Sequence, residues 1–492
     1  MIKSISFFDE ITVWWDRGEF SGAREFSVFA NGKQALITDK THITLGDLCP
    51  DSEYKIDMYG LSGGKVVCEK SLRVFTQRPK RRIDVTAAPY FAAGDGRTLD
   101  TAAIQAAVDA CAEDEYVYFP AGVFLTGALE LKSDLEIYVS EQATIQGVAD
   151  LSGYLPMRPS RFEGVERNCY RSLLNFGKMD SRGGYTSRNL IIRGKGKILG
   201  GGRELFNAAL DKPGVIYDEN GPQNTAAVEA WRSRGRLLEV CNAQNVVVCG
   251  LTMGMSASWN LHFIYSKEIT TYNCKIISQG INNGDGWDPD SCEDCAIFAC
   301  EFFTGDDLIA IKSGKNPEGN IIGRPCENIY IFDCKSMGGH GMSLGSEISG
   351  GIKNVFVWDC DFSDCWYGFQ IKATKKRGAY VKNIYVSNCK LSCVLIWAVG
   401  YNDDGEGVPA VPVFEDFHFK DITVTGTDYF IKVKTSAHKR YIFIRGFDEA
   451  HPVKKVNFSG VTLLKEDKSA PGIETEFVSD ITFKNVTDKT VG

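Results

Sequence analysis

A short sequence pattern recurs along most of the chain and constrains the fold more than any other feature. Each copy begins with a polar or charged residue, continues with alternating apolar positions, and ends with a small apolar residue. Successive copies start 23 to 39 residues apart, and two earlier ones begin at Asp134 and Asn189. The later copies occupy residues 245–251, 268–274, 294–300, 328–334, 354–360, 383–389, 416–422, 455–461 and 480–486.

Each copy predicts one β-strand, because its apolar residues alternate with a period of two and are rich in β-branched and aromatic types. One such strand every 23 to 39 residues, with Gly-rich connections, is typical of a stacked solenoid. We therefore predict an all-β fold in which residues 86–492 form a right-handed parallel β-helix.

The last position of the pattern is often cysteine. We interpret these cysteines as a stack of reduced thiols inside the solenoid, where Cys behaves as a small apolar residue. Cys292 and Cys295 have the spacing of half a zinc site, but a structural zinc needs a second ligand pair at suitable spacing. The cysteines of the stack are Cys274, Cys300, Cys334, Cys360 and Cys389.

The chain before the repeats predicts two further parts. Asp100 is a candidate N-cap for an amphipathic helix at about 100–111, which would cover the open end of the solenoid. Residues 1–78 contain short alternating strands, and the segment that ends at Tyr54 resembles the tyrosine corner of a fibronectin type III β-sandwich. The basic residues within 79–85 then form the expected linker.

Composition limits the classes of partner. The chain has 492 residues, 43% of them hydrophobic, and a net charge of −8, which argues against a nucleic-acid partner. It has no apolar run long enough for a membrane partner and no signal-like start, so we predict a cytoplasmic protein, or a secreted one if a leader was removed. The oligomeric state stays open.

Polar residues follow the strands at a repeated distance. Each lies 12 to 18 residues after the start of its copy, just past the strand and its turn. Since coils of a β-helix stack about 4.8 Å apart, these side chains should line one groove parallel to the axis, which suits a linear polymer. They are His262, Asp285, Asp306, Asp307, His340, Gln370, Lys372 and Tyr401.

Paired carboxylates in such a groove can cleave a glycosidic bond, one as a proton donor and one as a base. Asp306 and Asp307 are adjacent, and their repulsion should raise one pKa. Neighbours on a regular strand face opposite sides, so either Gly305 introduces a bend or one of the two aspartates faces inward. We expect Lys312 and the other groove cations to bind a substrate that carries carboxylates, and Asn283 to contact the same substrate.

At these residues the sequence resembles the polygalacturonases, glycoside hydrolase family 28. Segment 283–286 reads Asn-Gly-Asp-Gly, where the family has Asn-Thr-Asp-Gly; 305–307 reads Gly-Asp-Asp; and 339–341 reads Gly-His-Gly. The likeness covers about residues 85 to 490. Segments 305–314 and 345–351 look most like bacterial, often exo-acting members, some of which carry an N-terminal fibronectin-like domain.

The resemblance implies a pectin-lyase-like β-helix and an inverting hydrolase that needs no metal or organic cofactor. Asp306 would be the general acid, and Asp285 and Asp307 would position and deprotonate water. His340 would tune the acid, and Lys372 would bind a uronate carboxylate. The implied substrate is a pectic oligosaccharide, with His262 and Tyr401 as further groove residues.

Position 370 departs from the family, because Gln370 stands where the family has arginine. Either Arg377 compensates, or the preferred sugar is not plain galacturonate. The inserts at about 153–188 and 201–236 could close one end of the groove, which would favour exo action. Two alternatives stay open: a polysaccharide lyase on the same fold, and a non-catalytic glycan-binding solenoid.

Overall fold

The computed structural model describes residues 1–218 and 221–490, which divide into two compact units. The first contains Met1–Arg82 with Asp114–Tyr116, and the second contains the rest of the described chain. No helix in residues 1–218 or 221–490 combines the length and the apolar character that a membrane crossing requires.

The first unit is a β-sandwich of two antiparallel sheets with its own apolar core. The sheet orders are β1-β2-β5 and β4-β3-β6-β7. The hydroxyl of Tyr54 accepts a hydrogen bond from the Cys49 N–H at 2.8 Å, a contact of the kind found in a tyrosine corner. The strands are β1 (Ile2–Ser6), β2 (Ile11–Trp15), β3 (Glu25–Ala30), β4 (Lys33–Thr38), β5 (His42–Leu45), β6 (Glu53–Ser62) and β7 (Lys65–Phe75), with the 3-10 helix η1 at Arg17–Phe20.

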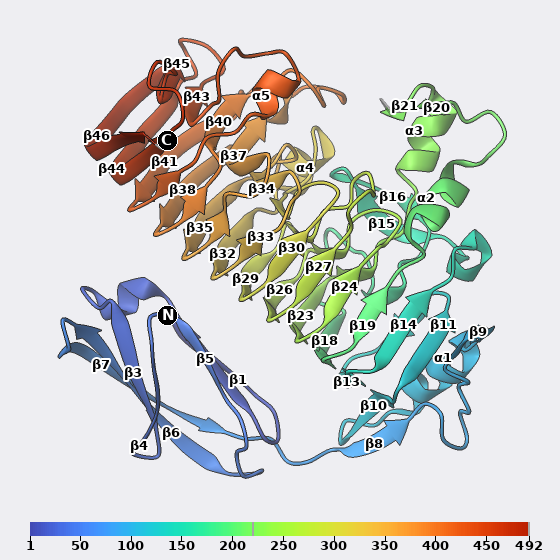
Figure 1. The fold of residues 1–492 in the computed structure, drawn as a ribbon. Coiled ribbons are helices and arrows are strands. Elements are labelled where there is room, and N and C mark those ends of the chain that lie inside the picture. Colours follow the sequence, from blue (N-terminus) through green and yellow to red (C-terminus); the bar gives the residue numbers. More distant parts are fainter. Residues whose placement is uncertain (219–220, 491–492) are drawn as a thin grey trace. The chain divides into compact units, whose positions relative to one another are not determined.

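The second unit is a parallel β-helix, which confirms the predicted fold class (Figure 1). Its larger sheet has 24 strands. It contains β8 (Arg81–Asp84), β9 (Asp95–Leu99), β10 (Glu115–Phe119), β11 (Gly122–Thr126), β13 (Leu135–Val139), β14 (Ala143–Gly147), β18 (Ser187–Gly194), β19 (Lys197–Leu199), β23 (Ala243–Cys249), β24 (Thr252–Gly254), β26 (Lys267–Tyr272), β27 (Lys275–Ile277), β29 (Glu293–Phe298), β30 (Glu301–Phe303), β32 (Cys326–Phe332), β33 (Lys335–Ser336), β35 (Ile352–Trp358), β36 (Asp361–Phe362), β38 (Tyr380–Ser387), β39 (Lys390–Leu391), β41 (Val413–Lys420), β42 (Thr423–Val424), β44 (Val453–Lys465) and β46 (Val478–Thr490).

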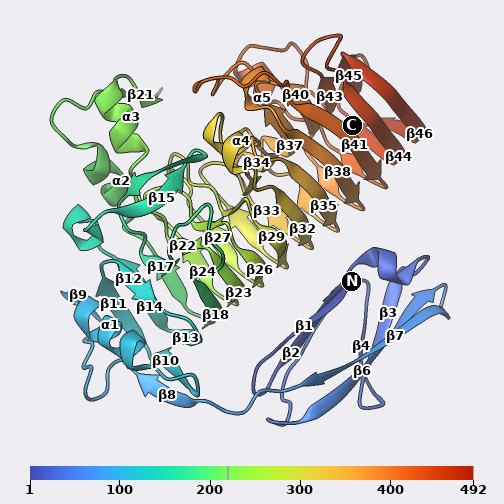
Figure 2. The same cartoon turned by 180° about the vertical axis from the view of Figure 1, so that it is seen from behind.

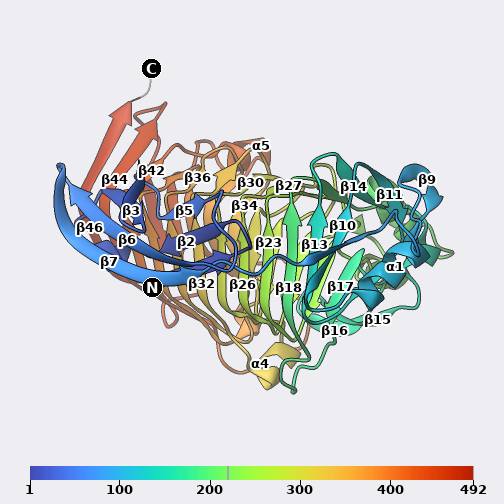
Figure 3. The same ribbon diagram turned by 90° about the horizontal axis from the view of Figure 1, so that it is seen from below.

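The solenoid has a second parallel sheet, which contains 11 strands. Its strands follow one another in chain order, one per coil. The larger sheet takes two strands from most coils, and the view from below shows its strands stacked side by side along the solenoid (Figure 3). The strands of the 11-stranded sheet are β12 (Leu129–Leu131), β17 (Leu174–Gly177), β22 (Leu238–Cys241), β25 (Leu261–Ile264), β28 (Trp287–Asp290), β31 (Ile309–Ile311), β34 (Gly341–Leu344), β37 (Tyr367–Ala373), β40 (Val394–Ala398), β43 (Ile442–Arg445) and β45 (Ile473–Glu476).

The first residue of each sequence copy has a left-handed backbone, which explains why the position is polar. Asn328, Asn354 and Asn383 have φ of 57°, 57° and 59°, a region that Asn tolerates better than most residues. Their side chains also form a ladder: the amides of Asn354 and Asn383 each donate to the preceding Asn at 3.0 Å. The repeated Asn thus fixes both the turn and the coil-to-coil register.

The interior is apolar along the solenoid, and the five stacked cysteines are buried free thiols, as predicted. Helix α1 (Thr101–Ala110) buries Ile104, Ala107 and Val108 in this core. The Asp100 side chain makes no capping bond; it accepts hydrogen bonds from the N–H groups of Ala93 and Gly94 instead. The expected linker 79–85 also differs, because β8 forms within it.

Two inserts interrupt the coils near the 11-stranded sheet, and both are visible in the view from behind (Figure 2). The first contains the hairpin β15–β16 and the second contains α2 and α3. The elements outside the coils are η2 (Leu151–Tyr154), β15 (Arg158–Phe162), β16 (Val165–Cys169), α2 (Gly202–Leu210), β20 (Tyr217–Asp218), β21 (Gly221–Pro222), α3 (Thr225–Trp231), α4 (Glu318–Ile322), η3 (Lys375–Arg377) and α5 (Tyr429–Lys432).

Candidate active site

The three groove aspartates and His340 lie in turns that immediately precede strands of the 11-stranded sheet. Asp285 precedes β28, Asp306 and Asp307 precede β31, and His340 precedes β34. The backbone joins these turns from coil to coil: the Gly286 N–H donates to the Asp307 carbonyl at 3.0 Å, and the His340 N–H donates to the Asp306 carbonyl at 2.8 Å. Because Asp306 and Asp307 are in a turn, strand alternation does not separate them.

These acids open into a cavity of about 430 Å³. Its walls combine the stacked turns with both inserts and with the segment that contains Asn402. The predicted site residues in the wall are Asn283, Asp285, Asp306, Asp307, Lys312 and Lys372.

Asp306 forms an ion pair with His340, whose Nδ1 lies 2.7 Å from Asp306 Oδ1. Burial opposes the charged form of both groups, but the pair outweighs it: the pKa of Asp306 is lowered by the His340 imidazolium, and the pKa of His340 is raised by the Asp306 carboxylate. Trp366 stacks on the imidazole, with ring centroids 4.2 Å apart.

Asp307 pairs with a lysine rather than with a histidine. Lys372 Nζ donates to Asp307 Oδ2 at 3.2 Å, while Asp307 Oδ1 is buried and has no hydrogen-bond partner among the described residues. Buried carboxylate oxygens are normally hydrogen-bonded, so this oxygen has room for one further donor such as water.

Asp285 shares Lys312 with a deeper acid, Asp288. Lys312 Nζ lies 3.1 Å from Asp285 Oδ2 and 3.4 Å from Asp288 Oδ1, and 3.7 Å from the ring centroid of Trp259. Burial raises the pKa of Asp285 well above its usual value and raises the pKa of Asp288 to about 7, although Lys312 opposes both shifts.

Repulsion between the adjacent aspartates does not raise the pKa of Asp306. The ion pair with His340 lowers the pKa of this carboxyl, and the carboxyls with raised pKa values are Asp285 and Asp288. The His340 imidazolium lowers the pKa of Asp306, whereas burial is the main cause of the raised pKa values of Asp285 and Asp288.

Asp306, Asp307 and His340 also place three possible ligand atoms within 4.8 Å of one another. In the described chain, His340 and Lys372 already occupy oxygens of the two carboxylates. A cation bound through His340 Nδ1 and Asp306 Oδ1 would have to displace the ion pair between these two groups.

Three predicted substrate-binding residues are buried and do not reach a cavity wall. His262 is fully buried under Trp259, whose ring lies 4.8 Å away, and burial lowers its pKa to about 3. The buried Gln370 amide donates to Ser343 Oγ at 2.7 Å. Arg377, also buried, holds the carbonyls of Ser346 and Asn402. The structure thus places these three side chains outside the walls of both cavities.

Asn283 and Tyr401, the remaining predicted substrate-binding residues, each line a cavity that also contains Asp306. Asn283 accepts a hydrogen bond from Arg234 Nη2 at 2.6 Å in the wall of the first cavity. Tyr401, 47% exposed, lines a second cavity of about 640 Å³ that shares Asp306, Lys372 and Asn402 with the first.

Arg232, at the end of α3, is a cavity residue that the sequence did not reveal. It forms ion pairs with Glu163 of the first insert at 2.7 Å and with Asp404 at 2.8 Å. Lys315 contacts the same Asp404 carboxylate. Nothing in the repeat pattern could identify these residues, because Arg232 and Glu163 lie in inserts outside it.

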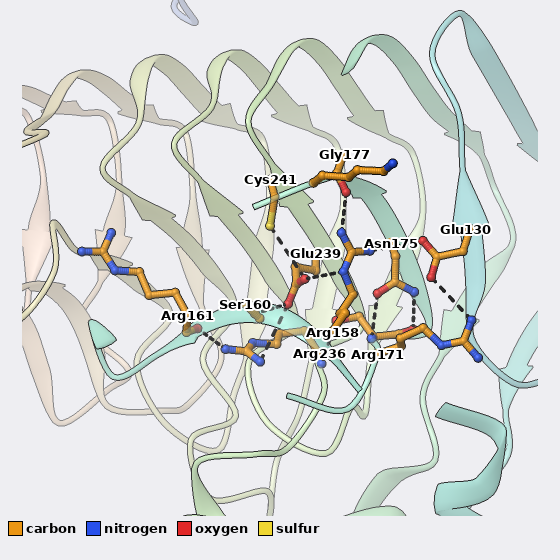
Figure 4. A network of polar contacts seen from close by, with 12 residues as sticks. Glu130, Arg158, Ser160, Arg161, Arg171, Asn175, Gly177, Arg236, Glu239 and Cys241 are labelled. Atoms are coloured by element: carbon orange, nitrogen blue, oxygen red, sulfur yellow. Dashed lines mark hydrogen bonds and ion pairs between the residues drawn. The ribbon is translucent and has the colours of Figure 1, made fainter. Parts of the chain in front are cut away.

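The first insert is anchored by a network of buried polar groups (Figure 4). Arg161 forms an ion pair with Asp290 at 3.0 Å, and both side chains are fully buried. Ser160 Oγ donates to Glu239 on β22 at 2.6 Å, and Arg236 donates to the Arg161 carbonyl. These contacts fix the hairpin β15–β16, and thus one cavity wall, against the coils.

The chain is similar in sequence to known polygalacturonases. A plant relative, a probable polygalacturonase from Vitis vinifera, is 29% identical over 347 residues, covering 67% of this chain and 66% of that protein. An exo-poly-alpha-D-galacturonosidase from Dickeya chrysanthemi is 28% identical over 396 residues, with coverages of 72% and 65%. The chain thus spans slightly less than two thirds of the length of these relatives.

Solved structures show the same architecture. A hyperthermoactive exopolygalacturonase from Thermotoga maritima superposes with a TM-score of 0.71 at 27% identity, covering 84% of this chain and 92% of that one. A family 28 exopolygalacturonase from Yersinia enterocolitica gives a TM-score of 0.74 at 19% identity over 100% of this chain and 98% of that one, a likeness of fold. The profile of glycosyl hydrolases family 28 matches residues 120–470, and the chain therefore belongs to that family.

Proposed function

We propose that this protein hydrolyses glycosidic bonds in galacturonate-containing pectic chains, with inversion at the anomeric carbon and release of sugar from a chain end. The observation that carries the proposal is the convergence of Asp285, Asp306 and Asp307 on one cavity together with Lys312 and Lys372. The family membership and the activities named for the relatives support the same reaction.

The Asp306–His340 pair is the proton donor in this proposal. The pair holds one acidic proton between a carboxylate and an imidazole 2.7 Å apart. As the bond between the anomeric carbon and the leaving oxygen breaks, Asp306 delivers a proton to that oxygen and regains one from His340. Because Asp306 is partly exposed, with 24% of its side chain accessible, it can reach a bound sugar.

Asp307 and Asp285 act on the water. Each has one buried carboxylate oxygen, Oδ1, without a partner among the described residues, and both side chains line the same cavity. Water bound between them attacks the anomeric carbon, and its proton passes to Asp307. Asp285, whose pKa burial raises, orients this water by hydrogen bonding.

The two lysines provide charge for a uronate substrate. Lys312 and Lys372 line the cavity, and the neighbouring carboxylates raise their pKa values, so both stay protonated despite burial. Charged hydrogen bonds between an ammonium group and a carboxylate are the interactions that a sugar acid would form here.

The inserts support release from a chain end. Glu163 and Arg232 belong to different inserts and both line the cavity, and Arg232 also joins the segment that carries Asp404. A wall built from three tied segments limits how far a polymer can pass beyond the acids.

The test is incubation with de-esterified oligogalacturonates, with reducing ends and ultraviolet absorbance followed together, because an elimination product carries a conjugated double bond that absorbs in the ultraviolet. New reducing ends without ultraviolet absorbance are the expected result. Absorbance that increases with cleavage would identify a lyase, and binding without cleavage would identify a glycan-binding solenoid.

A further inference from the structure

One row of outward-facing positions on the 11-stranded sheet carries a cation at every second coil. Strand pairing aligns Ile311 with Leu344 and Leu344 with Ile371, so the residues that follow them, Lys312, Gly345 and Lys372, are neighbours in the row. The pairing then aligns Lys372 with Trp397, and Trp397 with Arg445. Two coil spacings, about 10 Å, therefore separate Lys372 from Arg445 along the axis.

Arg445 differs from the two lysines in what it contacts. Lys312 and Lys372 are paired with aspartates. Arg445 donates from Nη2 to the Ala398 carbonyl at 2.9 Å and lies 5.7 Å from the Phe443 ring centroid, and no carboxylate within the described part of the chain forms an ion pair with it. Glu476 on β45 pairs in register with Arg445 and is the next residue of the row, so one acid lies a single coil away without forming an ion pair with it.

Arg445 also faces the same space as the proton donor. It lines the second cavity, of about 640 Å³, together with Asp306, His340 and Lys372. Trp366 contributes an exposed indole to this cavity, with 43% of the residue accessible. The indole stacks on His340 at 4.2 Å and on Tyr429 at 4.8 Å, so it adds an apolar wall beside the cations rather than a free ring face. A sugar acid bound in this cavity can place its carboxylate at the positive charge.

We propose that Arg445 binds the carboxylate of a second uronate unit, placed further toward the C-terminal end of the solenoid than the unit held at Lys372. A pyranose unit has a length similar to one coil spacing, so the two cations fit carboxylates on units that are not adjacent. Gln370 is neutral and buried, so it offers no charge to a substrate. Arg445 would supply a guanidinium at a different place along the solenoid. The inference rests on the proposed substrate class, but not on turnover.

The test is calorimetric binding of galacturonate dimer and tetramer to the full chain with Asp306→Asn, which prevents consumption of the ligand. Adding Arg445→Gln should weaken tetramer binding about tenfold or more, because one charged hydrogen bond is lost, and change dimer binding less than about twofold. Arg445→Lys should restore part of the affinity. Lys454→Gln, which removes an exposed cation on β44, is the matched control and should change neither affinity.

A methyl-esterified tetramer gives a second readout. It should bind the protein with Arg445 more weakly than the free acid, and this difference should shrink in Arg445→Gln. Equal losses for dimer and tetramer, an unchanged tetramer affinity, or no binding of either oligomer with Arg445 present would each overturn the subsite. If wild-type protein releases no reducing ends while the Arg445-dependent binding is seen, the proposed hydrolysis fails and the subsite stands.

Discussion

His340 Nδ1 lies 2.7 Å from Asp306 Oδ1, and the ion pair raises the pKa of His340 while it lowers that of Asp306. The pair therefore keeps its acidic proton until the pH rises through the raised pKa of His340, and activity should fall above that point. In His340→Asn the only remaining proton site is the carboxyl, so the basic limb of kcat/KM against pH should move down by at least about one unit.

His418 offers a matched control, because its Nε2 lies 3.0 Å from Asp416 Oδ1 in a similar pair outside both cavities. His418→Asn should leave the pH profile unchanged. A basic limb that stays in place in His340→Asn would contradict the role of the pair as proton donor.

Replacement of Asp306 by Asn should remove the proton donor and leave the fold intact. We expect kcat to fall by about 10²- to 10⁴-fold, the usual contribution of a general acid. Thermal unfolding by circular dichroism checks that the variant is folded, and Glu141→Gln, an exposed acid on the coil surface, controls for the loss of a negative charge. Near-normal turnover of Asp306→Asn would remove this residue from the mechanism.

Arg232→Ala should loosen the cavity wall, since Arg232 contacts both Glu163 and Asp404. If this wall limits the enzyme to chain ends, the variant should release longer products from polymeric substrate early in the reaction, as resolved by anion-exchange chromatography. Lys376→Ala removes a nearby but exposed pair with Asp403 at 3.3 Å and should retain the wild-type products. Identical product lengths in Arg232→Ala would show that other features set the mode of attack.

The Asn ladder gives a prediction about stability. Asn354 has φ of 57°, donates to Asn328 and accepts from Asn383. Asn354→Gly keeps the backbone relaxed and loses the ladder contacts, at about 1–2 kcal/mol, whereas Asn354→Ala adds left-handed strain of about 1–2 kcal/mol more. Urea unfolding should therefore rank wild type above Gly and Gly above Ala; an Ala variant as stable as the Gly variant would contradict the strain argument.

The sequence predicted the solenoid well, because the repeat itself encodes it. Alternating apolar residues specify the inward face, and the left-handed polar residue at the start of each copy, often Asn or Asp, specifies the turn. The spacing also indicated that Asp285, Asp306, Asp307 and His340 share one side, and the structure brings them into consecutive stacked turns.

The sequence could not predict which of the groove residues are buried, because the inserts and loops that cover them determine this. His262 faces outward on β25 but is covered by Trp259, on which Phe162 of the first insert stacks at 4.6 Å. Arg377 lies in a basic run that looks solvent-exposed, yet it is fully buried and hydrogen-bonded to backbone carbonyls. Side-chain burial of this kind depends on which insert covers which coil, and periodicity does not contain that information.

The most direct test of the central claim is to follow the anomeric signals by NMR while the enzyme cleaves a galacturonate oligomer. The account predicts that the first product appears with the β configuration, opposite to that of the α-linked substrate, and then equilibrates slowly, since water between Asp285 and Asp307 attacks opposite the proton donor. Initial accumulation of the α anomer, or of an unsaturated product, would contradict it.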